Sequence, residues 1–248
     1  MLSINKLKAL KRLHTKKERD AEAVFIAEGS KLVADLLNCF ACETLLATPE
    51  WISENTPIAA ELIAISEAEL KKISLQKTPQ QVFAVFKQPK PILNKTSLLN
   101  ELSLALDDIQ DPGNLGTIFR IADWFGIEKV FCSLHCADIF NPKTIQASMG
   151  AIGRIQVFKV NLPEFLAELK PNLPLYGSFL SGQNIYDAPL SSTGIIVMGN
   201  EGKGISQAVE AQLTQGLFIP SYPSHRPCSE SLNVATATAI ICAEFRRR

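Results

Sequence analysis

Side chains that could bind or activate a substrate are concentrated in three polar loops. The loop at 107–116 reads DDIQDPGNLG, the loop at 199–204 reads GNEGKG, and the stretch from Ile219 to Ile240 reads IPSYPSHRPCSESLNVATATAI. Their carboxylate, amide, hydroxyl and guanidinium groups can bind and orient a polar substrate. Each loop follows a short apolar run, and loops held by a rigid scaffold are where binding and catalytic residues concentrate.

Two of the candidate residues fall on a helix that we expect to begin after Asp111. Asn114 lies on its first turn. Arg120 flanks its apolar stripe, so that the guanidinium could reach a phosphate or a carboxylate. The alternatives are a turn role for Asn114 and a surface arginine paired with Asp123. Glu201, in the second loop, is either a site acid or an ordinary exposed acid.

The glycines of the loop at 199–204 allow a backbone to come close to a ligand, although an ordinary tight turn is the alternative. The second half of the chain has no G-x-G-x-x-G after a strand, which disfavours a Rossmann site, and no P-loop motif is present. A thiol hydrolase would depend on Cys228 and His225, which are close in sequence. Ser229 and Ser231 are also close to His225, but the chain has no G-x-S-x-G elbow of a serine hydrolase.

The cysteines and the N-terminus indicate a cytoplasmic protein. Lysines interrupt any apolar run after Met1, and no apolar run is long enough to span a bilayer. The six cysteines are therefore expected as reduced thiols. Cys39 and Cys42 have metal-ligand spacing, and Cys132 and Cys136 nearly so, but both pairs lie in apolar context. We predict no metal site and no membrane segment.

Charge is unevenly distributed along a chain whose formal net charge is zero. In the first twenty residues, Glu18 and Asp20 are the acids that face a basic cluster of Lys6, Lys8, Lys11, Arg12, Lys16, Lys17 and Arg19. Such a cluster is either a solvated helix face or a surface that contacts phosphates.

Periodicity predicts two α/β regions, at 1–90 and 101–248, joined by a linker at 91–100 that overlaps the proline-containing stretch KQPKPILNKTS at 87–97. In the first we expect helices at 3–19, 30–37 and 67–74 and strands at 24–27, 44–47, 63–65 and 82–86. In the second we expect strands at 102–106, 129–132, 155–158, 175–177, 195–198 and 217–219 and helices at 112–125, 142–148, 163–169, 206–213 and 232–246. Continuous apolar strands that alternate with helices predict a mostly parallel sheet covered on both faces.

Together the three loops resemble the motifs of the SpoU (TrmH) RNA ribose 2′-O-methyltransferases of the SPOUT superfamily. The matching segments are D-P-x-N-x-G-x-x-x-R-x-A at Asp111–Ala122, M-G-N-E-G-x-G at Met198–Gly204 and I-P…S-L-N-V-A at Ile219–Ala235. Their order and spacing agree across 102–245, and PKTIQASMGA at 142–151 is also similar to the family. The first half, with VFIAEGSKLVADLL, is similar to the family's ribosomal-protein-like RNA-binding domain.

The resemblance implies a trefoil-knotted α/β domain at 101–248 that binds S-adenosylmethionine, behind a small α/β RNA-binding domain. Backbone groups near Gly199, Ile219 and Leu232 would hold the cofactor. The substrate side of the site would consist of Asn114, Arg120, Glu201, Ser231 and Asn233. Family members are typically homodimers with the site at the interface.

The implied activity is methyl transfer to a ribose 2′-OH of tRNA or rRNA. We expect Arg120 to grip the RNA phosphate and the 2′-oxygen, since a guanidinium is a poor general base. The basic cluster is then expected to contact RNA through Lys11, Arg12, Lys16 and Lys17. The alternative is a non-catalytic RNA-binding or assembly factor that keeps the knotted fold. The loop Ser221–Glu230 is longer than the family usually has, and is either a flap over the site or a surface excursion.

Overall fold

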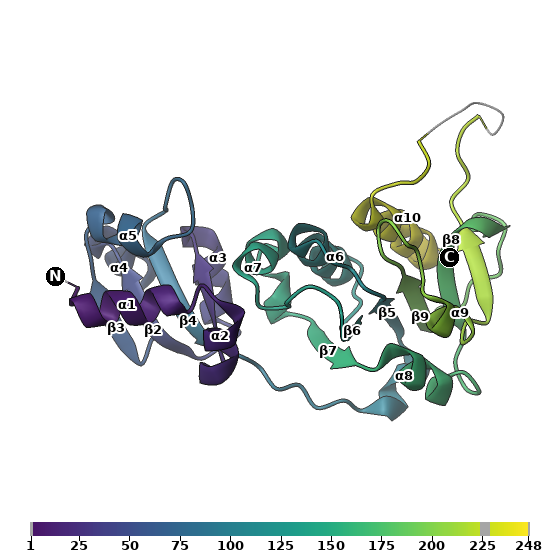
Figure 1. The fold of residues 1–248 in the computed structure, drawn as a ribbon, viewed down its shortest axis with the longest axis horizontal. Coiled ribbons are helices and arrows are strands. Elements are labelled where there is room, and N and C mark those ends of the chain that lie inside the picture. The colour runs from purple at the N-terminus through teal and green to yellow at the C-terminus, as the bar shows by residue number, and fades with distance from the viewer. Residues whose placement is uncertain (1, 224–228, 248) are drawn as a thin grey trace. The chain divides into compact units, whose positions relative to one another are not determined.

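The computed structural model of the protein describes residues 2–223 and 229–247. Its contacts divide the chain into two compact units (Figure 1). The first combines Met1–Lys90 with Asp138–Arg154, and the second combines Pro91–Ala137 with Ile155–Arg248. The segment Asp138–Arg154 thus groups with the N-terminal residues, although the predicted C-terminal domain includes it.

A mixed four-stranded sheet forms the centre of the first unit. Its strand order is β1-β4-β2-β3, in which β4 is antiparallel to β1 and β2, and β2 is parallel to β3. The strands are β1 (Val24–Glu28), β2 (Cys42–Ala47), β3 (Glu61–Ala64) and β4 (Val82–Lys87). The helices before residue 90 are α1 (Ile4–Arg12), α2 (Lys16–Glu22), α3 (Ser30–Leu37), α4 (Pro49–Asn55) and α5 (Glu67–Ile73).

The prediction of one helix over 3–19 is wrong, because α1 ends at Arg12 and α2 begins at Lys16. Between them, Nη1 of Arg19 donates to the carbonyl oxygens of Leu13 and His14, both at 2.9 Å. A side chain thus satisfies acceptors that a continuous helix would pair with backbone N–H groups. Leu10 of α1 and Leu13 after it are nevertheless buried in the core of this unit.

Helix α4 is absent from the elements that periodicity predicts. It has clear start signals, since Thr48 accepts a hydrogen bond from the Trp51 backbone N–H and Pro49 occupies the first turn. However, Trp51 is its buried residue, so the segment has no repeating apolar stripe to reveal a helix.

An all-parallel six-stranded sheet forms the second unit, in the order β10-β8-β9-β5-β6-β7. Its strands are β5 (Leu102–Leu106), β6 (Lys129–Ser133), β7 (Gln156–Val160), β8 (Leu175–Asn184), β9 (Gly194–Met198) and β10 (Gln215–Phe218). Its helices are η1 (Lys95–Asn100), α6 (Pro112–Trp124), α8 (Leu162–Leu169), α9 (Gln207–Glu210) and α10 (Val234–Arg247). The predicted α/β class is confirmed: a smaller α/β unit comes first in the sequence, and a unit with a parallel sheet follows it.

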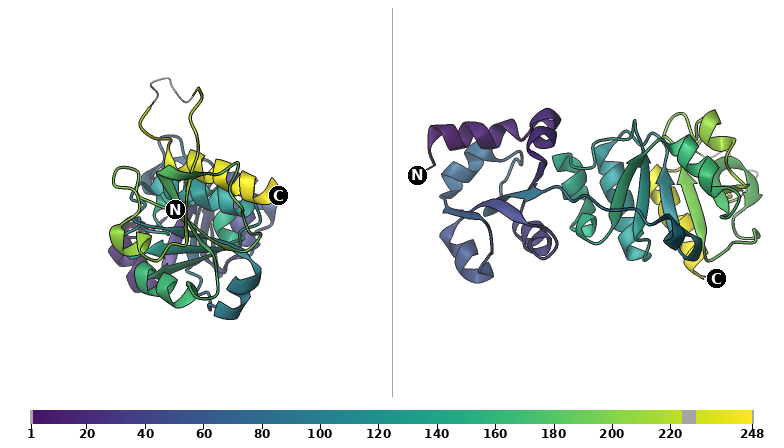
Figure 2. Two further views of the ribbon diagram at one scale, coloured as in Figure 1. Left: turned by 90° about the vertical axis from the view of Figure 1, so that its right-hand side faces the viewer. Right: turned by 90° about the horizontal axis from the view of Figure 1, so that it is seen from below.

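Helices cover both faces of this sheet. Leu175 of β8 packs in a core that contains Phe165 of α8 and Val209 of α9. Neighbouring residues of a strand point to opposite faces. The next residue, Tyr176, contacts Phe245 of α10 with ring centroids 4.9 Å apart, so α10 lies on the other face. Helices α6 and α10 lie side by side there (Figure 2).

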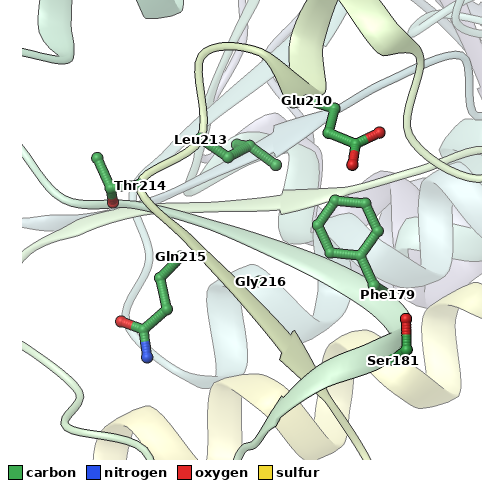
Figure 3. A pocket seen from close by; sticks show the side chains of 7 residues that line it. All are labelled: Phe179, Ser181, Glu210, Leu213, Thr214, Gln215 and Gly216. Atoms are coloured by element: carbon green, nitrogen blue, oxygen red, sulfur yellow. The ribbon is translucent and has the colours of Figure 1, made fainter.

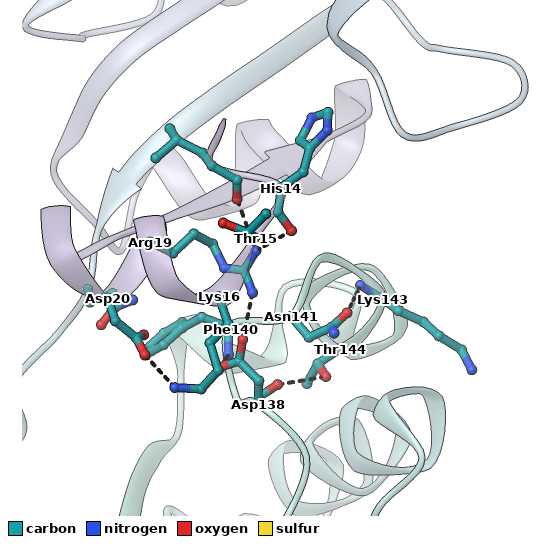
Figure 4. Close-up of polar contacts among 12 residues, drawn as sticks. His14, Thr15, Lys16, Arg19, Asp20, Asp138, Phe140, Asn141, Lys143 and Thr144 are labelled. Carbon is teal, nitrogen blue, oxygen red and sulfur yellow. Dashed lines mark hydrogen bonds and ion pairs between the residues drawn. The ribbon is translucent and has the colours of Figure 1, made fainter. Parts of the chain in front are cut away.

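The segment Asp138–Arg154 holds α7 (Pro142–Ser148) and the 3-10 turn η2 (Ala151–Gly153), and α7 packs on β1. Arg19, whose side chain is 2% exposed, donates from Nη2 to Oδ2 of Asp138 at 2.6 Å (Figure 4). The rings of Phe25 and Phe140 stack with centroids 5.3 Å apart. A buried ion pair and an aromatic stack therefore attach this segment to the first unit.

The predicted linker at 91–100 is not a free connection, because Leu98 of η1 is fully buried in the core of the second unit. The trefoil knot implied by the resemblance involves the passage from β10 to α10, and residues 224–228 of that passage lie outside the described residues. Among the residues described, no helix combines the length and the apolar character needed to cross a membrane.

Candidate active site

The polar loops leave the carboxyl ends of strands in the parallel sheet, where ligands of such sheets bind. The loop at 107–116 follows β5 and the loop at 199–204 follows β9, its neighbour in the sheet. Strand β10 is an edge strand, separated from β9 by β8. The segment 219–233 therefore connects the edge strand β10 to α10, which packs against α6.

Three of the predicted site residues, one from each loop, meet in a hydrogen-bonded row. Asn233 donates from Nδ2 to Oδ1 of Asn114 at 3.0 Å. Asn114 donates from its own Nδ2 to Oε1 of Glu201 at 2.9 Å. Residues separated by up to 119 positions in sequence thus converge at one place. We call Asn233, Asn114 and Glu201 the amide row.

The direction of the amide row follows from its surroundings. Oδ1 of Asn233 accepts the backbone N–H groups of Ala235 and Thr236 at the start of α10, at 2.9 and 3.3 Å. The Nδ2 group of Asn233 is then the one that faces Asn114. Since an amide oxygen accepts and an amide nitrogen donates, Asn114 must present Oδ1 to Asn233 and Nδ2 to the carboxylate of Glu201.

Asn114 is positioned by the start of its own helix. Asp111 is the N-cap of α6, and its Oδ1 accepts the Asn114 backbone N–H at 2.8 Å, with Pro112 in the first turn. The helix thus begins after Asp111, as the sequence predicts. The buried side chains of Leu115 and Phe119 then fix the rotation of α6 against the sheet.

The loop that carries Glu201 closes on itself through Asn200. The backbones of Asn200 and Gly204 exchange two hydrogen bonds, of 3.0 and 2.9 Å, and Oδ1 of Asn200 accepts the N–H groups of Gly202 and Lys203. A Cβ at residue 199 would lie 2.4 Å from the Gly204 backbone, so this close turn requires glycine there. Asn200 was not among the predicted site residues. Its position between two of them in the motif is the signal that could have found it.

The remaining predicted substrate residues lie near the amide row in sequence but do not belong to it. Arg120 is exposed on α6, six residues after Asn114. Six residues of α-helix turn the side chain through about 120° and advance it about 9 Å, so the two side chains leave α6 in different directions. Ser231 is exposed, two residues before Asn233.

Two of the predicted cofactor residues follow the strands on either side of β8. Gly199 follows β9 and Ile219 follows β10, the two neighbours of β8. The pairing of β10 with β8 jumps from Gly177 to Gln183, so the intervening residues of β8 leave the ladder. Leu232, just before α10, is 51% exposed, which is high for a large apolar side chain. An apolar surface beside backbone polar groups fits an adenine ring and the polar end of a nucleoside cofactor.

A shallow hollow of about 320 Å³ lies beside the edge strand β10 and the part of β8 that leaves the ladder (Figure 3). It is lined by Phe179, Ser181, Glu210, Leu213, Thr214, Gln215 and Gly216. It contains none of the predicted site residues. We therefore locate the candidate site by the converging polar side chains and not by this hollow.

The predicted RNA-contacting residues belong to the first unit, and all four are exposed. Arg12 forms an ion pair with Glu18 at 2.7 Å, and Lys16 forms one with Asp20. Lys11 and Lys17 form no ion pair with an acid among the residues described. The basic cluster is thus partly neutralised, and Arg19 is buried in its pair with Asp138 instead of facing solvent.

The thiols and histidines give no sign of a metal site within the described residues, where no group of three or more potential ligands occurs. Cys39 is exposed and Cys42 is buried. Burial raises the pKa of Cys42 to about 11. His225 and Cys228, the residues of the alternative thiol hydrolase, lie outside the described residues, as does most of the long loop that contains them.

Comparison with protein families gives two matches that together cover most of the chain. Residues 101–243 match the SpoU rRNA Methylase family, and residues 5–84 match the MRM3-like substrate binding domain. A curated relative, 23S rRNA (guanosine(2553)-2′-O)-methyltransferase RlmP of Bacillus subtilis, is 34% identical, with 97% of this chain and 96% of that protein covered.

Solved structures are similar over the full length. A TrmH-family protein from Porphyromonas gingivalis has a TM-score of 0.89 and 44% identity, covering 100% of this chain and 99% of that one. An AdoMet-bound rRNA methyltransferase from Sinorhizobium meliloti has a TM-score of 0.83 and 28% identity, covering 100% and 97%. Both units therefore occur together in these relatives.

Proposed function

Since this chain belongs to the SpoU rRNA methylase family, we propose that it methylates a ribose 2′-OH of ribosomal RNA. It is an RNA 2′-O-methyltransferase that uses S-adenosylmethionine. The sequence alone leaves open whether the substrate is tRNA or rRNA. The Bacillus subtilis relative is named for 23S rRNA, and the match extends through the N-terminal unit, which supports large-subunit rRNA over tRNA.

The observation that carries this function is the amide row. A factor that had lost catalysis would not need to retain Asn233, Asn114 and Glu201 from three separate loops in mutual hydrogen bonds of 2.9 to 3.0 Å. Polar side chains held by their neighbours are preorganised to bind and orient a substrate. We assign to the amide row the task of holding the reacting nucleotide.

S-adenosylmethionine supplies an electrophilic methyl group when bound. We assign its binding to the backbone near Gly199, Ile219 and Leu232. The exposed Leu232 side chain offers an apolar surface, and the residues of β8 that leave the ladder offer backbone donors and acceptors. The Sinorhizobium meliloti relative is described as AdoMet-bound, which supports this assignment.

Arg120 has the role of gripping the RNA phosphate and the 2′-oxygen. Its guanidinium stays charged, and so it lowers the cost of negative charge on the oxygen without taking the proton. Ser231 lies beside the amide row in sequence and supplies a hydroxyl to the same substrate. Replacing Arg120 with Lys removes the planar fork, and near-normal turnover of that variant at saturating RNA would contradict two-point gripping.

The direction of Arg120 supports a homodimer. Its side chain leaves α6 about 120° away from that of Asn114. Arg120 of one subunit therefore points away from the amide row of the same subunit, and a second subunit can bring an Arg120 to that row. Trp124, one turn further along α6, is 82% exposed, and an exposed tryptophan is typical of an interface. Sedimentation equilibrium tests the dimer, and Trp124→Asp should dissociate it.

Two measurements test the proposed function. Calorimetry with S-adenosylmethionine separates the enzyme from the alternative, a non-catalytic assembly factor, because an enzyme must bind the cofactor. Mapping of 2′-O-methyl groups in total RNA, with and without the gene, then identifies the substrate. A missing methyl group in tRNA with rRNA unchanged would contradict our assignment. The predicted cytoplasmic location agrees with an rRNA substrate.

A further inference from the structure

Both ends of the loop that carries Glu201 are attached to two consecutive residues at the end of β5. The Asp108 carbonyl oxygen accepts a hydrogen bond from Nδ2 of Asn200 at 2.7 Å. The buried Asp107 carboxylate accepts the backbone N–H of Ser206 at 2.8 Å through Oδ2. The backbone path through 107 and 108 therefore determines where the 199–204 loop sits.

That path contains an unfavourable conformation. Asp108 has φ of 56°, in the left-handed region that most residues with a Cβ avoid. Its peptide groups point correctly for Asn200 only while this conformation lasts. Aspartate tolerates the region better than most residues, but something nearby must favour it over the ordinary right-handed or extended alternatives.

Ser133, the last residue of β6, provides that restraint. Its hydroxyl accepts the Asp108 backbone N–H at 2.9 Å and donates to Oδ1 of Asp108 at 2.7 Å. One hydroxyl thus binds both the main chain and the side chain of the same residue. Ser133 is 5% exposed, in a strand end where an apolar residue would be buried at lower cost, so these two bonds explain why a polar side chain stands there.

We propose that Ser133 is a positioning residue for the methyl transfer. It holds Asp108 in the left-handed conformation, Asp108 holds Asn200, and Asn200 fixes the direction in which Glu201 meets Asn114. This inference rests on the proposed function for its kinetic consequence, while the chain of hydrogen bonds stands without it. Ser133 does not contact the amide row and acts through the loop alone.

The test compares full-length Ser133→Ala with the wild type. The alanine variant loses the restraint, and we expect kcat at saturating RNA and S-adenosylmethionine to fall about 10-fold. The Kd for S-adenosylmethionine should change less than kcat, because two of the three predicted cofactor residues, Ile219 and Leu232, lie outside the 199–204 loop. Ser133→Thr keeps the hydroxyl and should restore most of the lost kcat.

A backbone variant separates positioning from general stability. Glycine adopts positive φ without a restraint, so Asp108→Gly introduced into Ser133→Ala should raise kcat above that of Ser133→Ala alone. Ser103→Ala is the matched control. The Ser103 hydroxyl is also buried in the sheet but has no hydrogen-bond partner among the described residues, so its loss should leave kcat unchanged.

Hydrogen exchange gives a readout that does not depend on activity. The backbone N–H groups of Gly202 and Lys203 donate to Asn200, and their exchange should accelerate in Ser133→Ala but not in Ser103→Ala. Unchanged exchange together with wild-type kcat would overturn the positioning role. A wild type that transfers no methyl group to RNA would refute the proposed function instead, and the exchange experiment would still decide the role of Ser133.

Discussion

Replacing Asn233 with aspartate would separate its two roles. In the wild type, Oδ1 caps α10 by accepting the N–H groups of Ala235 and Thr236, and Nδ2 donates to Asn114. Aspartate is as good an N-cap as asparagine, so the helix should be kept. However, an ionised carboxylate cannot donate, and it would present an oxygen to the oxygen of Asn114.

Asn114 has no orientation that satisfies both neighbours in this variant. If its amide turned to donate to the new carboxylate, its oxygen would face the carboxylate of Glu201, so one hydrogen bond is lost in either orientation. In either orientation Asn114 keeps one bond to a carboxylate, so the net loss is one neutral hydrogen bond, which costs about 1 kcal/mol. Repulsion between carboxylates about 8 Å apart adds roughly 0.5 kcal/mol in water. The sum, about 1.5 kcal/mol, corresponds to a loss of about 13-fold in kcat/KM.

The assay is methyl transfer from labelled S-adenosylmethionine to rRNA, with thermal unfolding measured on the same samples. Asn233→Asp should have a Tm close to that of the wild type and a strongly reduced kcat/KM. Asn233→Ser also keeps a cap, lacks the added charge, and should lose less activity. If Asn233→Asp kept the wild-type kcat/KM, the hydrogen bond that Asn233 donates to Asn114 would not be needed to position the substrate.

Three further predictions concern the first unit. Asp138→Ala leaves the buried Arg19 without its partner and should lower the free energy of unfolding by about 3–5 kcal/mol, measured by urea titration; an unchanged midpoint would show that Asp138–Arg154 is not anchored there. Hydrogen bonds from the Ser66 cap and from Leu2 lower the pKa of Glu69 to about 2. The folded form therefore binds fewer protons, so stability present above pH 4.5 is lost as the pH falls toward 2, and Glu69→Gln should lose less over that range. Replacing Lys11 and Lys17 with Ala should reduce the salt dependence of RNA binding by about two ion contacts, more than the same change at the ion-paired basic residues.

Local signals were sufficient to predict the frame of the site. The cap at Asp111, the proline after it and the apolar stripe that follows predict α6, and α6 begins at Pro112 as expected. The continuous apolar strands predict the parallel sheet, which in turn predicts that polar loops gather at its carboxyl edge. These features depend on residues that are neighbours in sequence.

The internal order of the site was not predictable in the same way. The hydrogen bond from Asn114 to Glu201 joins residues 87 positions apart, and that from Asn200 to Asp108 joins residues 92 apart. No periodicity relates such pairs. The family motifs propose a set of site residues, but Ser133 lies outside those motifs and comes next to Asp108 only because β6 lies beside β5.

Arg19 illustrates why the basic cluster was misread in part. A sequence argument assigns arginine to the surface, because burying an unpaired charge is costly. Here the cost is met by two backbone carbonyl groups and by Asp138, a residue 119 positions away. The same contacts end α1 early and attach Asp138–Arg154 to the first unit. A single buried guanidinium thus accounts both for the broken helix and for the unexpected grouping of this segment, and both should fail together when its acidic partner is removed.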